Sequence, residues 1–201
     1  MAMALPWHPG DLRPGPSTDY HGFPEDPAGD VARAKVGKPP VSRLDSMIRR
    51  LTAQRMCIDE AARLLAGRPG CVFELGLGNG RTFDHLREVM PDREIFAFDR
   101  AIGAHPKCIP DAAHLILGEI RETLQFCGPR VPGKPVLINI DLGTSDPTQD
   151  LITMSWLSPR VAEWVAPGTI VVADRRLEGS YRELPKPDGC PASGHLLLEA
   201  V

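Results

Sequence analysis

The sequence predicts an α/β fold: a three-layer α/β/α sandwich whose central sheet is mostly parallel and doubly wound. Three observations predict this fold. Short, continuously apolar runs alternate with amphipathic segments from residue 71 onward, as parallel strands do when helices cover both faces of a sheet. A glycine-rich turn directly follows the first apolar run. The 201 residues, of which 42% are hydrophobic, are enough for one domain with a buried core.

The first part of the chain differs from the rest in its proline content. Eight of the 21 prolines fall within the first 40 residues, where no helical or strand period is visible. We therefore expect residues 1–41 to form an arm and residues 42–201 to form the domain. The aromatic residues Trp7, Tyr20 and Phe23 favour an arm that packs on the domain.

A long amphipathic helix is predicted over residues 43–66. Ser42 and Asp45 have the spacing of a capping box, and apolar residues recur every three or four positions up to Leu65. Between residues 33 and 55 there are seven Lys or Arg and one acid. This basic run is either a solvated helix face or a surface for an anionic substrate.

The remaining elements alternate between strands and helices. The predicted strands are 71–75, 94–98, 114–117, 136–140, 169–173 and 195–201. The predicted helices follow the first, third and fourth strands, and the last helix, 149–165, is expected to break at Ser158 and Pro159. Only 28 residues follow Ala173, and several are Pro or Gly, so we expect a shortened C-terminal hairpin. An exposed sheet edge would favour a homo-oligomer.

Composition excludes several classes of protein. No run of 18 apolar residues suggests a membrane span, and the first ten residues do not resemble a secretory signal, so we expect a cytoplasmic protein. The net charge of −3 and the pI near 6.1 do not favour nucleic acid as a partner. Five Cys without a C-x-x-C pair and six scattered His predict neither a disulfide framework nor a metal site.

The glycine-rich turn carries the chemical signal. Residues 74–82 read ELGLGNGRT, and in a doubly wound sheet ligands bind beyond the carboxyl ends of the strands. Glycines let the backbone turn sharply and approach a ligand closely. The dinucleotide fingerprint G-x-G-x-x-G fails because Arg81 stands where the third glycine is required, which disfavours a Rossmann-like oxidoreductase.

Residues 73–82 resemble motif I of the class I S-adenosylmethionine-dependent methyltransferases, which have a Rossmann-like fold. Polar residues at three further strand ends continue the resemblance, which covers residues 71–175: Asp99, Gly118 with Glu119, and Asp141. The implied cofactor is S-adenosyl-L-methionine, whose sulfonium and ammonium groups suit acidic strand ends.

The resemblance also implies roles for single residues. Glu74 would hold the methionine end of the cofactor, directly or through water, and Asp99 would bind the ribose hydroxyls. Glu119 would approach the adenine amino group, with Arg100 beside the ring. The positions assigned to cofactor binding are Glu74, Gly76, Gly78, Asn79, Arg81, Thr82, Asp99, Arg100, Gly118, Glu119 and Asp141.

The implied reaction is methyl transfer to an unidentified small-molecule acceptor by in-line displacement, in which alignment supplies much of the catalysis. Asp141 is the candidate general base, and it is equally a candidate cofactor ligand without proton transfer. Two alternatives remain open at this stage. The chain could be a non-catalytic S-adenosylmethionine-binding protein, or a metal-assisted catechol-type O-methyltransferase that uses Asp141 and Asp174, although Arg175 would oppose a metal.

Overall fold

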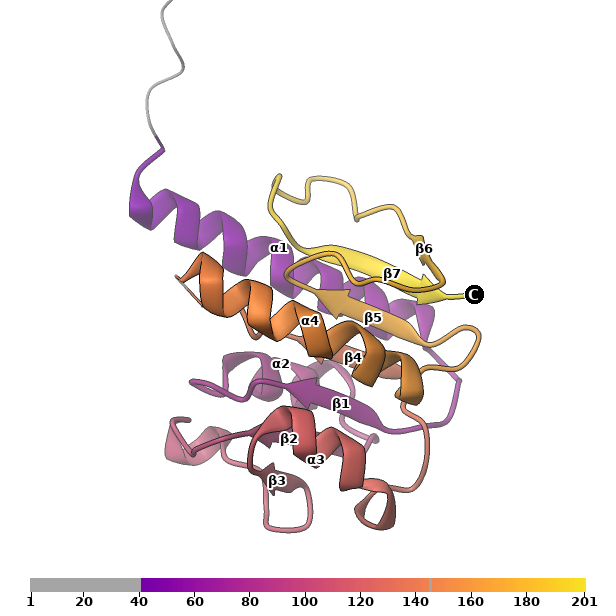
Figure 1. Ribbon diagram of the computed structural model, residues 1–201. Coiled ribbons are helices and arrows are strands. Elements are labelled where there is room, and N and C mark those ends of the chain that lie inside the picture. The colour runs from indigo at the N-terminus through magenta and orange to yellow at the C-terminus, as the bar shows by residue number, and fades with distance from the viewer. Residues whose placement is uncertain (1–40, 145) are drawn as a thin grey trace, which may run out of the picture. The chain divides into compact units, whose positions relative to one another are not determined.

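The computed structural model describes residues 41–144 and 146–201 (Figure 1). The predicted arm therefore lies, apart from residue 41, outside the described residues. A seven-stranded sheet has the order β3-β2-β1-β4-β5-β7-β6. Its strands are β1 (Val72–Leu75), β2 (Ile95–Asp99), β3 (Leu115–Leu117), β4 (Leu137–Ile140), β5 (Ile170–Ala173), β6 (Tyr181–Glu183) and β7 (Leu196–Ala200). Strands β1 to β5 are parallel, and β7 is antiparallel to both β5 and β6.

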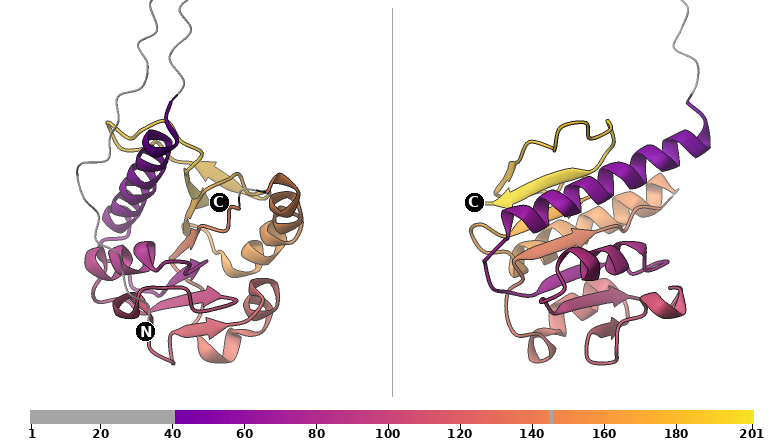
Figure 2. Two further views of the ribbon diagram at one scale, coloured as in Figure 1. Left: turned by 90° about the vertical axis from the view of Figure 1, so that its left-hand side faces the viewer. Right: turned by 180° about the vertical axis from the view of Figure 1, so that it is seen from behind.

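Within the part of the chain that the structure describes, four α-helices cover the two faces of this sheet. They are α1 (Arg43–Leu64), α2 (Arg81–Val89), α3 (Ile120–Phe126) and α4 (Pro147–Trp164). Helices α1 and α2 lie on one face, and α3 and α4 lie on the other (Figure 2). The predicted three-layer sandwich is therefore confirmed. Among the described residues, no helix combines the length and the apolar character needed to cross a membrane.

Alternate side chains of each strand enter two separate cores, one on each face of the sheet. In β1, Val72 packs in the core beneath α1 and α2, whereas Phe73 packs in the core beneath α3 and α4. Strand β7 alternates in the same way, with Leu197 on the α1 face and Leu198 on the α4 face. This period of two identifies the side chains that share a face near the strand ends.

Helix α1 begins at the predicted capping box. The Ser42 hydroxyl accepts a hydrogen bond from the Asp45 backbone N–H at 2.9 Å and donates one to the Asp45 carboxylate at 2.8 Å. The helix ends at Leu64, and Gly67 follows with a left-handed φ of +75°. Glycine adopts this conformation at no steric cost, which makes it a common residue just beyond a helix end.

The predicted break at Ser158 and Pro159 is wrong, because α4 continues through both residues. A proline inside a helix removes one backbone hydrogen bond. Here Leu157 and Val161 are fully buried on either side of Pro159, and the Ser158 hydroxyl accepts a hydrogen bond from the Glu178 backbone N–H at 3.1 Å. Packing on both sides of the proline therefore holds the helix together.

The C-terminal hairpin is short, as expected, but it is complete. Strand β6 has three residues and pairs with β7 from Tyr181 to Glu183. The proline and glycine residues noted in the sequence lie mainly in the connection between these strands and do not truncate the sheet. Strand β6 is an edge strand of this open sheet, so the expectation of a homo-oligomer stays a prediction.

Candidate active site

The residues that the sequence predicts for the site lie at or just after the C-terminal ends of four parallel strands, β1 to β4. We call this side of the sheet, where the parallel strands end, its carboxyl edge. Figure 2 (left) looks toward this edge, with α1 and α4 on opposite faces of the sheet. Helix α1 precedes β1 and runs in the opposite direction, so its first half lies beside the same edge. The C-terminus lies at the other edge (Figure 1).

The glycine-rich turn uses positive φ angles at all three glycines: +95° at Gly76, +48° at Gly78 and +79° at Gly80. A Cβ on Gly76 would lie 2.6 Å from the backbone oxygen of Asp141, and one on Gly80 would lie 2.6 Å from the Cβ of Cys108. A Cβ on Gly78 would meet nothing within 4 Å. Gly76 and Gly80 thus serve close packing, whereas Gly78 borders open space where a ligand can approach the backbone.

Asp99 links the loops that follow three strands. Its Oδ2 accepts a hydrogen bond from the Gly78 backbone N–H at 2.8 Å, and its Oδ1 accepts one from Ala101 N–H at 3.3 Å. Its backbone oxygen accepts a third from Gly118 N–H at 2.9 Å. The end of β2 therefore holds together the glycine-rich turn and the loop after β3.

The other predicted positions of this region lie at the exposed rim. Asn79, Arg81 and Arg100 are exposed. Glu119 is exposed too, and it occupies the N-cap position of α3 without a capping hydrogen bond from its side chain. Its carboxylate is therefore available for a ligand rather than engaged with its own helix.

Glu74 lies deeper than the sequence suggested, with no exposed surface. One carboxyl oxygen accepts a hydrogen bond from the Thr82 hydroxyl, and the other accepts one from the Asn139 amide at 2.7 Å. Burial raises the pKa of Glu74 to about 8, although both hydrogen bonds oppose this shift. At neutral pH the carboxyl group is therefore mostly protonated. Glu74 and Thr82, which the sequence analysis assigned to cofactor binding, contact each other behind the glycine-rich turn.

Asp141, after β4, is held by helix α1. The Gln54 amide donates a hydrogen bond to Asp141 Oδ2 at 3.0 Å, and Arg50 forms an ion pair with Oδ1 at 3.5 Å. Arg50 belongs to the basic run, so one residue of that run faces the site. Sequence reasoning missed Gln54. The only signal for it is its position one helical turn after Arg50.

Asp174, after β5, is paired with its neighbour Arg175. The guanidinium donates to both Asp174 oxygens, at 3.1 and 2.9 Å, and also forms an ion pair with Asp150 of α4 at 3.3 Å. Hydrogen bonds from Thr144 lower the pKa of Asp150. In the described part of the chain, no group of three His, Cys, Asp or Glu side chains is arranged to hold a metal ion.

His195, just before β7, is a candidate that sequence reasoning missed. It is 1% exposed, and its Nε2 has no hydrogen-bond partner among the described residues. Burial lowers the pKa of the imidazole, which keeps it neutral at neutral pH. Its position two residues before the buried Leu197 is the signal that could have placed it on the α1 face.

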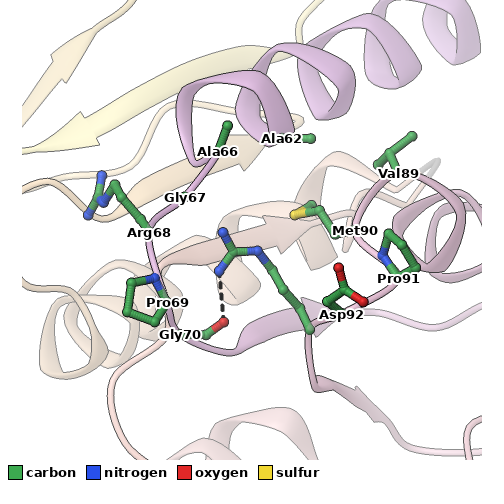
Figure 3. Close-up of a pocket in the computed structure, with 11 residues that line it drawn as sticks. Ala62, Ala66, Gly67, Arg68, Pro69, Gly70, Val89, Met90, Pro91 and Asp92 are labelled. Carbon is green, nitrogen blue, oxygen red and sulfur yellow. Dashed lines mark hydrogen bonds between the residues drawn. The ribbon is translucent and has the colours of Figure 1, made fainter.

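A pocket of about 490 Å³ lies at the opposite edge of the sheet, between the end of α1 and the end of α2 (Figure 3). Its Arg93 donates hydrogen bonds to the backbone oxygens of Gly70 at 2.9 Å and Leu65 at 2.7 Å. Arg93 thus caps the C-terminal end of α1. None of the predicted site residues lines this pocket. The pocket is therefore not part of the candidate active site at the carboxyl edge.

The groups at the carboxyl edge fit S-adenosylmethionine. Three carboxylates lie at the ends of strands on both sides of β1: Asp99 ends β2, Glu119 follows β3 and Asp141 follows β4. Gly78 leaves open space for a ligand. Acidic groups favour a cofactor that carries a sulfonium and an ammonium, and they would repel a pyrophosphate. The sequence model of a family described as "S-adenosyl-L-methionine methyltransferase" matches residues 41–199.

The chain belongs to this family. The methyltransferase is also similar to a solved S-adenosyl-L-methionine methyl transferase from Silicibacter pomeroyi DSS-3, with 38% identity and a TM-score of 0.74. That similarity covers 80% of this chain and 99% of the other. No curated protein matches this chain.

Two more distant structures are also similar to the methyltransferase. Human methyltransferase-like protein 13 in complex with SAH is 11% identical, with a TM-score of 0.47, over 77% of this chain and 82% of the other. DesVI of Streptomyces venezuelae is 16% identical, with a TM-score of 0.45, over 75% and 67%. Both are too distant to carry an inference about this chain.

The family membership establishes the activity in outline. The chain is an enzyme, a methyltransferase, and its methyl donor is S-adenosyl-L-methionine. The Rossmann-like fold agrees with this assignment. Neither a non-catalytic binder nor a metal-assisted catechol-type enzyme is favoured. A metal site would require Asp141 and Asp174, but Arg175 donates hydrogen bonds to both carboxylate oxygens of Asp174.

Proposed function

We propose that this methyltransferase transfers a methyl group to a small-molecule acceptor by in-line displacement at the carboxyl edge of its sheet. The observation that carries the proposal is the arrangement of Asp99, Glu119 and Asp141 after successive strands around an open glycine-rich turn. When bound, S-adenosylmethionine supplies a methyl group already activated by its sulfonium. The protein then mainly has to align this methyl group with the acceptor, because alignment alone lowers the barrier by about 7 to 11 kcal/mol.

The first half of the site binds the cofactor. Asp99 accepts hydrogen bonds from the ribose hydroxyls, and it is held in place because it also accepts the Gly78 N–H. Glu119 reaches the adenine amino group, with Arg100 beside the ring. The turn from Gly76 to Arg81 surrounds the methionine end.

Glu74 acts through its neighbours in this proposal. Its carboxyl group is fully buried and bonded to Thr82 and Asn139, so it fixes the start of α2 and the end of β4 relative to β1. Such a residue positions the turn and need not touch the cofactor.

The second half of the site receives the acceptor. Asp141 lies between the part of the site that binds the cofactor and the part that receives the acceptor. Its carboxylate is oriented by Gln54 and Arg50 of α1. A carboxylate held in this way is suited to bind the cofactor's ammonium or a polar group of the acceptor. Its side chain is 28% exposed and that of Arg50 is 39% exposed. Asp141 is thus partly covered by α1. A partly covered site favours a small molecule over a macromolecule as the acceptor.

The release of S-adenosylhomocysteine tests the class of acceptor. The protein is incubated with S-adenosylmethionine and either the low-molecular-mass fraction or the macromolecular fraction of a cell extract. We expect product with the first fraction, and less product when Asp99→Asn replaces the wild type at the same cofactor concentration. Product formed only with the macromolecular fraction would overturn the small-molecule proposal.

A further inference from the structure

We propose that His195 is the group that takes the proton of the methyl acceptor. This inference deepens the proposed function and rests on it. It adds a catalytic residue from the segment just before β7, outside the strands whose ends would bind the cofactor. It also specifies the acceptor as a molecule with an O–H or N–H that must lose its proton.

The strand register places His195 at the active edge of the sheet. Strands β5 and β7 are antiparallel, and Ala173 pairs with Leu196. One residue beyond this pair, His195 comes opposite Asp174. A Cβ on the neighbouring Gly194 would lie 3.2 Å from the Asp174 backbone oxygen, which shows how closely the two segments approach. The start of β7 and the ends of the parallel strands therefore share one edge.

The alternation of side chains places His195 on the face of the sheet that α1 covers. Leu197 belongs to the core beneath α1, and His195 precedes it by two positions, so both side chains point to the same face. Gln54 and Arg50, which hold Asp141, also belong to α1. His195 and Asp141 thus lie beneath the same helix at the same edge.

Four charged groups influence the His195 imidazole: Asp141 after β4, Asp174 after β5, Arg50 of α1, and Lys186 in the connection between β6 and β7. The two carboxylates raise its pKa and the two cations lower it, while burial is the largest effect and lowers it. These opposing charges identify His195 as part of the polar cluster at the site. Burial, the largest effect on the pKa, favours the neutral imidazole, which is the form that accepts a proton.

The buried Nε2 of His195 is free to accept a proton. This nitrogen has no hydrogen-bond partner among the described residues, and a role in catalysis is one of the explanations for a buried polar atom left unpaired. During the reaction, the acceptor oxygen or nitrogen forms a bond to the methyl carbon. The carbon–sulfur bond breaks with its electron pair going to sulfur, and the acceptor's proton passes to Nε2.

Histidine titration by NMR tests the placement without knowledge of the acceptor. The wild-type protein is labelled with ¹⁵N-histidine, and the His195 signals are assigned by comparison with His195→Gln. The pH titration is recorded with S-adenosylmethionine and with S-adenosylhomocysteine, which lacks the sulfonium charge. We expect the pKa of His195 to be lower with the sulfonium by on the order of one unit. His85 and His114, on α2 and before β3, should not change.

The outcomes separate this inference from the proposed function. If both ligands bind by calorimetry and His195 titrates identically with each, the inference is overturned while the proposed function stands. If neither ligand binds, the proposed function itself fails. A structural histidine would also predict that His195→Gln loses cofactor affinity or folding stability. We expect it to bind the cofactor normally and to lose methyl transfer to the low-molecular-mass fraction by 100-fold or more.

Discussion

The two proposed halves of the active site, the cofactor half and the acceptor half, are built in different ways. The cofactor half is formed by residues close together in sequence: the glycine-rich turn directly follows β1, and Asp99 lies 21 residues after Gly78. The acceptor half joins Gln54 of α1 to Asp141 after β4, 87 positions apart, and adds His195 before β7. Local backbone geometry defines the first half, and long-range packing defines the second.

The two halves also differ in how strictly the backbone dictates their residues. The cofactor half depends on positive φ angles and backbone N–H groups, for which few residues substitute. The acceptor half depends on side chains of α1 and β7, whose identity the backbone does not dictate. The following predictions test the separation between the halves, from the largest expected effect to the smallest.

Gly76→Ala should have the largest effect, because it affects both halves at once. Its Cβ would lie 2.6 Å from the Asp141 backbone oxygen and would force a side chain into a backbone with φ of +95°. We expect the free energy of unfolding to fall by about 2 to 5 kcal/mol, measured by chemical denaturation.

Gly78→Ala and Gly67→Ala form a matched pair for that experiment. Both glycines have positive φ, and neither Cβ would meet an atom within 4 Å. Each change should destabilise the fold by about 1 to 2 kcal/mol. Only Gly78→Ala should weaken binding of S-adenosylmethionine. An equal affinity in both variants would contradict the role of Gly78 as the open side of the cofactor half.

Asp99→Asn should weaken the cofactor half alone. The carboxylate accepts the Gly78 N–H at 2.8 Å, and hydrogen bonds to a charged group contribute about 1.5 to 3 kcal/mol. Calorimetry should therefore show a 10- to 100-fold loss of affinity for S-adenosylmethionine. Asp92→Asn, at the other edge of the sheet, is the control and should bind as the wild type does.

Glu74→Gln should change the pH dependence of stability. The pKa of Glu74 is raised to about 8 in the folded protein, compared with about 4.3 in an unfolded chain. Between these values the folded state holds a proton that the unfolded state has lost. Stability therefore falls as the pH rises from about 4 to 8, by up to about 1.4 kcal/mol per pH unit.

Chemical denaturation at pH 5 and pH 8 measures this slope. The glutamine variant cannot ionise, so it should lose less stability than the wild type between the two pH values, whereas Glu88→Gln, an exposed control, should keep the wild-type slope. The same slope in Glu74→Gln and the wild type would mean that Glu74 is not protonated in the folded protein.

Arg50→Gln should have the smallest effect on stability and a selective effect on function. The ion pair with Asp141 is partly exposed, and such pairs contribute less than about 1 kcal/mol. The affinity for S-adenosylmethionine should stay within about threefold of the wild-type value, which corresponds to about 0.65 kcal/mol. Methyl transfer should slow, because Arg50 orients Asp141 toward the acceptor. A loss of cofactor affinity as large as that of Asp99→Asn would show that α1 belongs to the cofactor half.

The sequence predicts the cofactor half far better than the acceptor half, for a physical reason. Glycine spacing, apolar runs and a capping box are local patterns, so they reveal the turn at residues 76–80, the parallel strands and the start of α1. Gln54 and His195 carry no local pattern, because their roles arise only when α1 and β7 pack at the same edge. The helix through Pro159 was mispredicted for a similar reason, since burial of Leu157 and Val161 outweighs the local effect of proline.

Hydrogen exchange of the wild-type protein with and without S-adenosylhomocysteine tests most directly where the cofactor binds. Exchange should slow at residues 76–82 and 99–101 and at Gly118 and Glu119, and it should stay unchanged at residues 66–70 and 89–93 around the pocket of Figure 3. Slowed exchange confined to residues 66–70 and 89–93 would contradict a cofactor site at the carboxyl edge of the sheet.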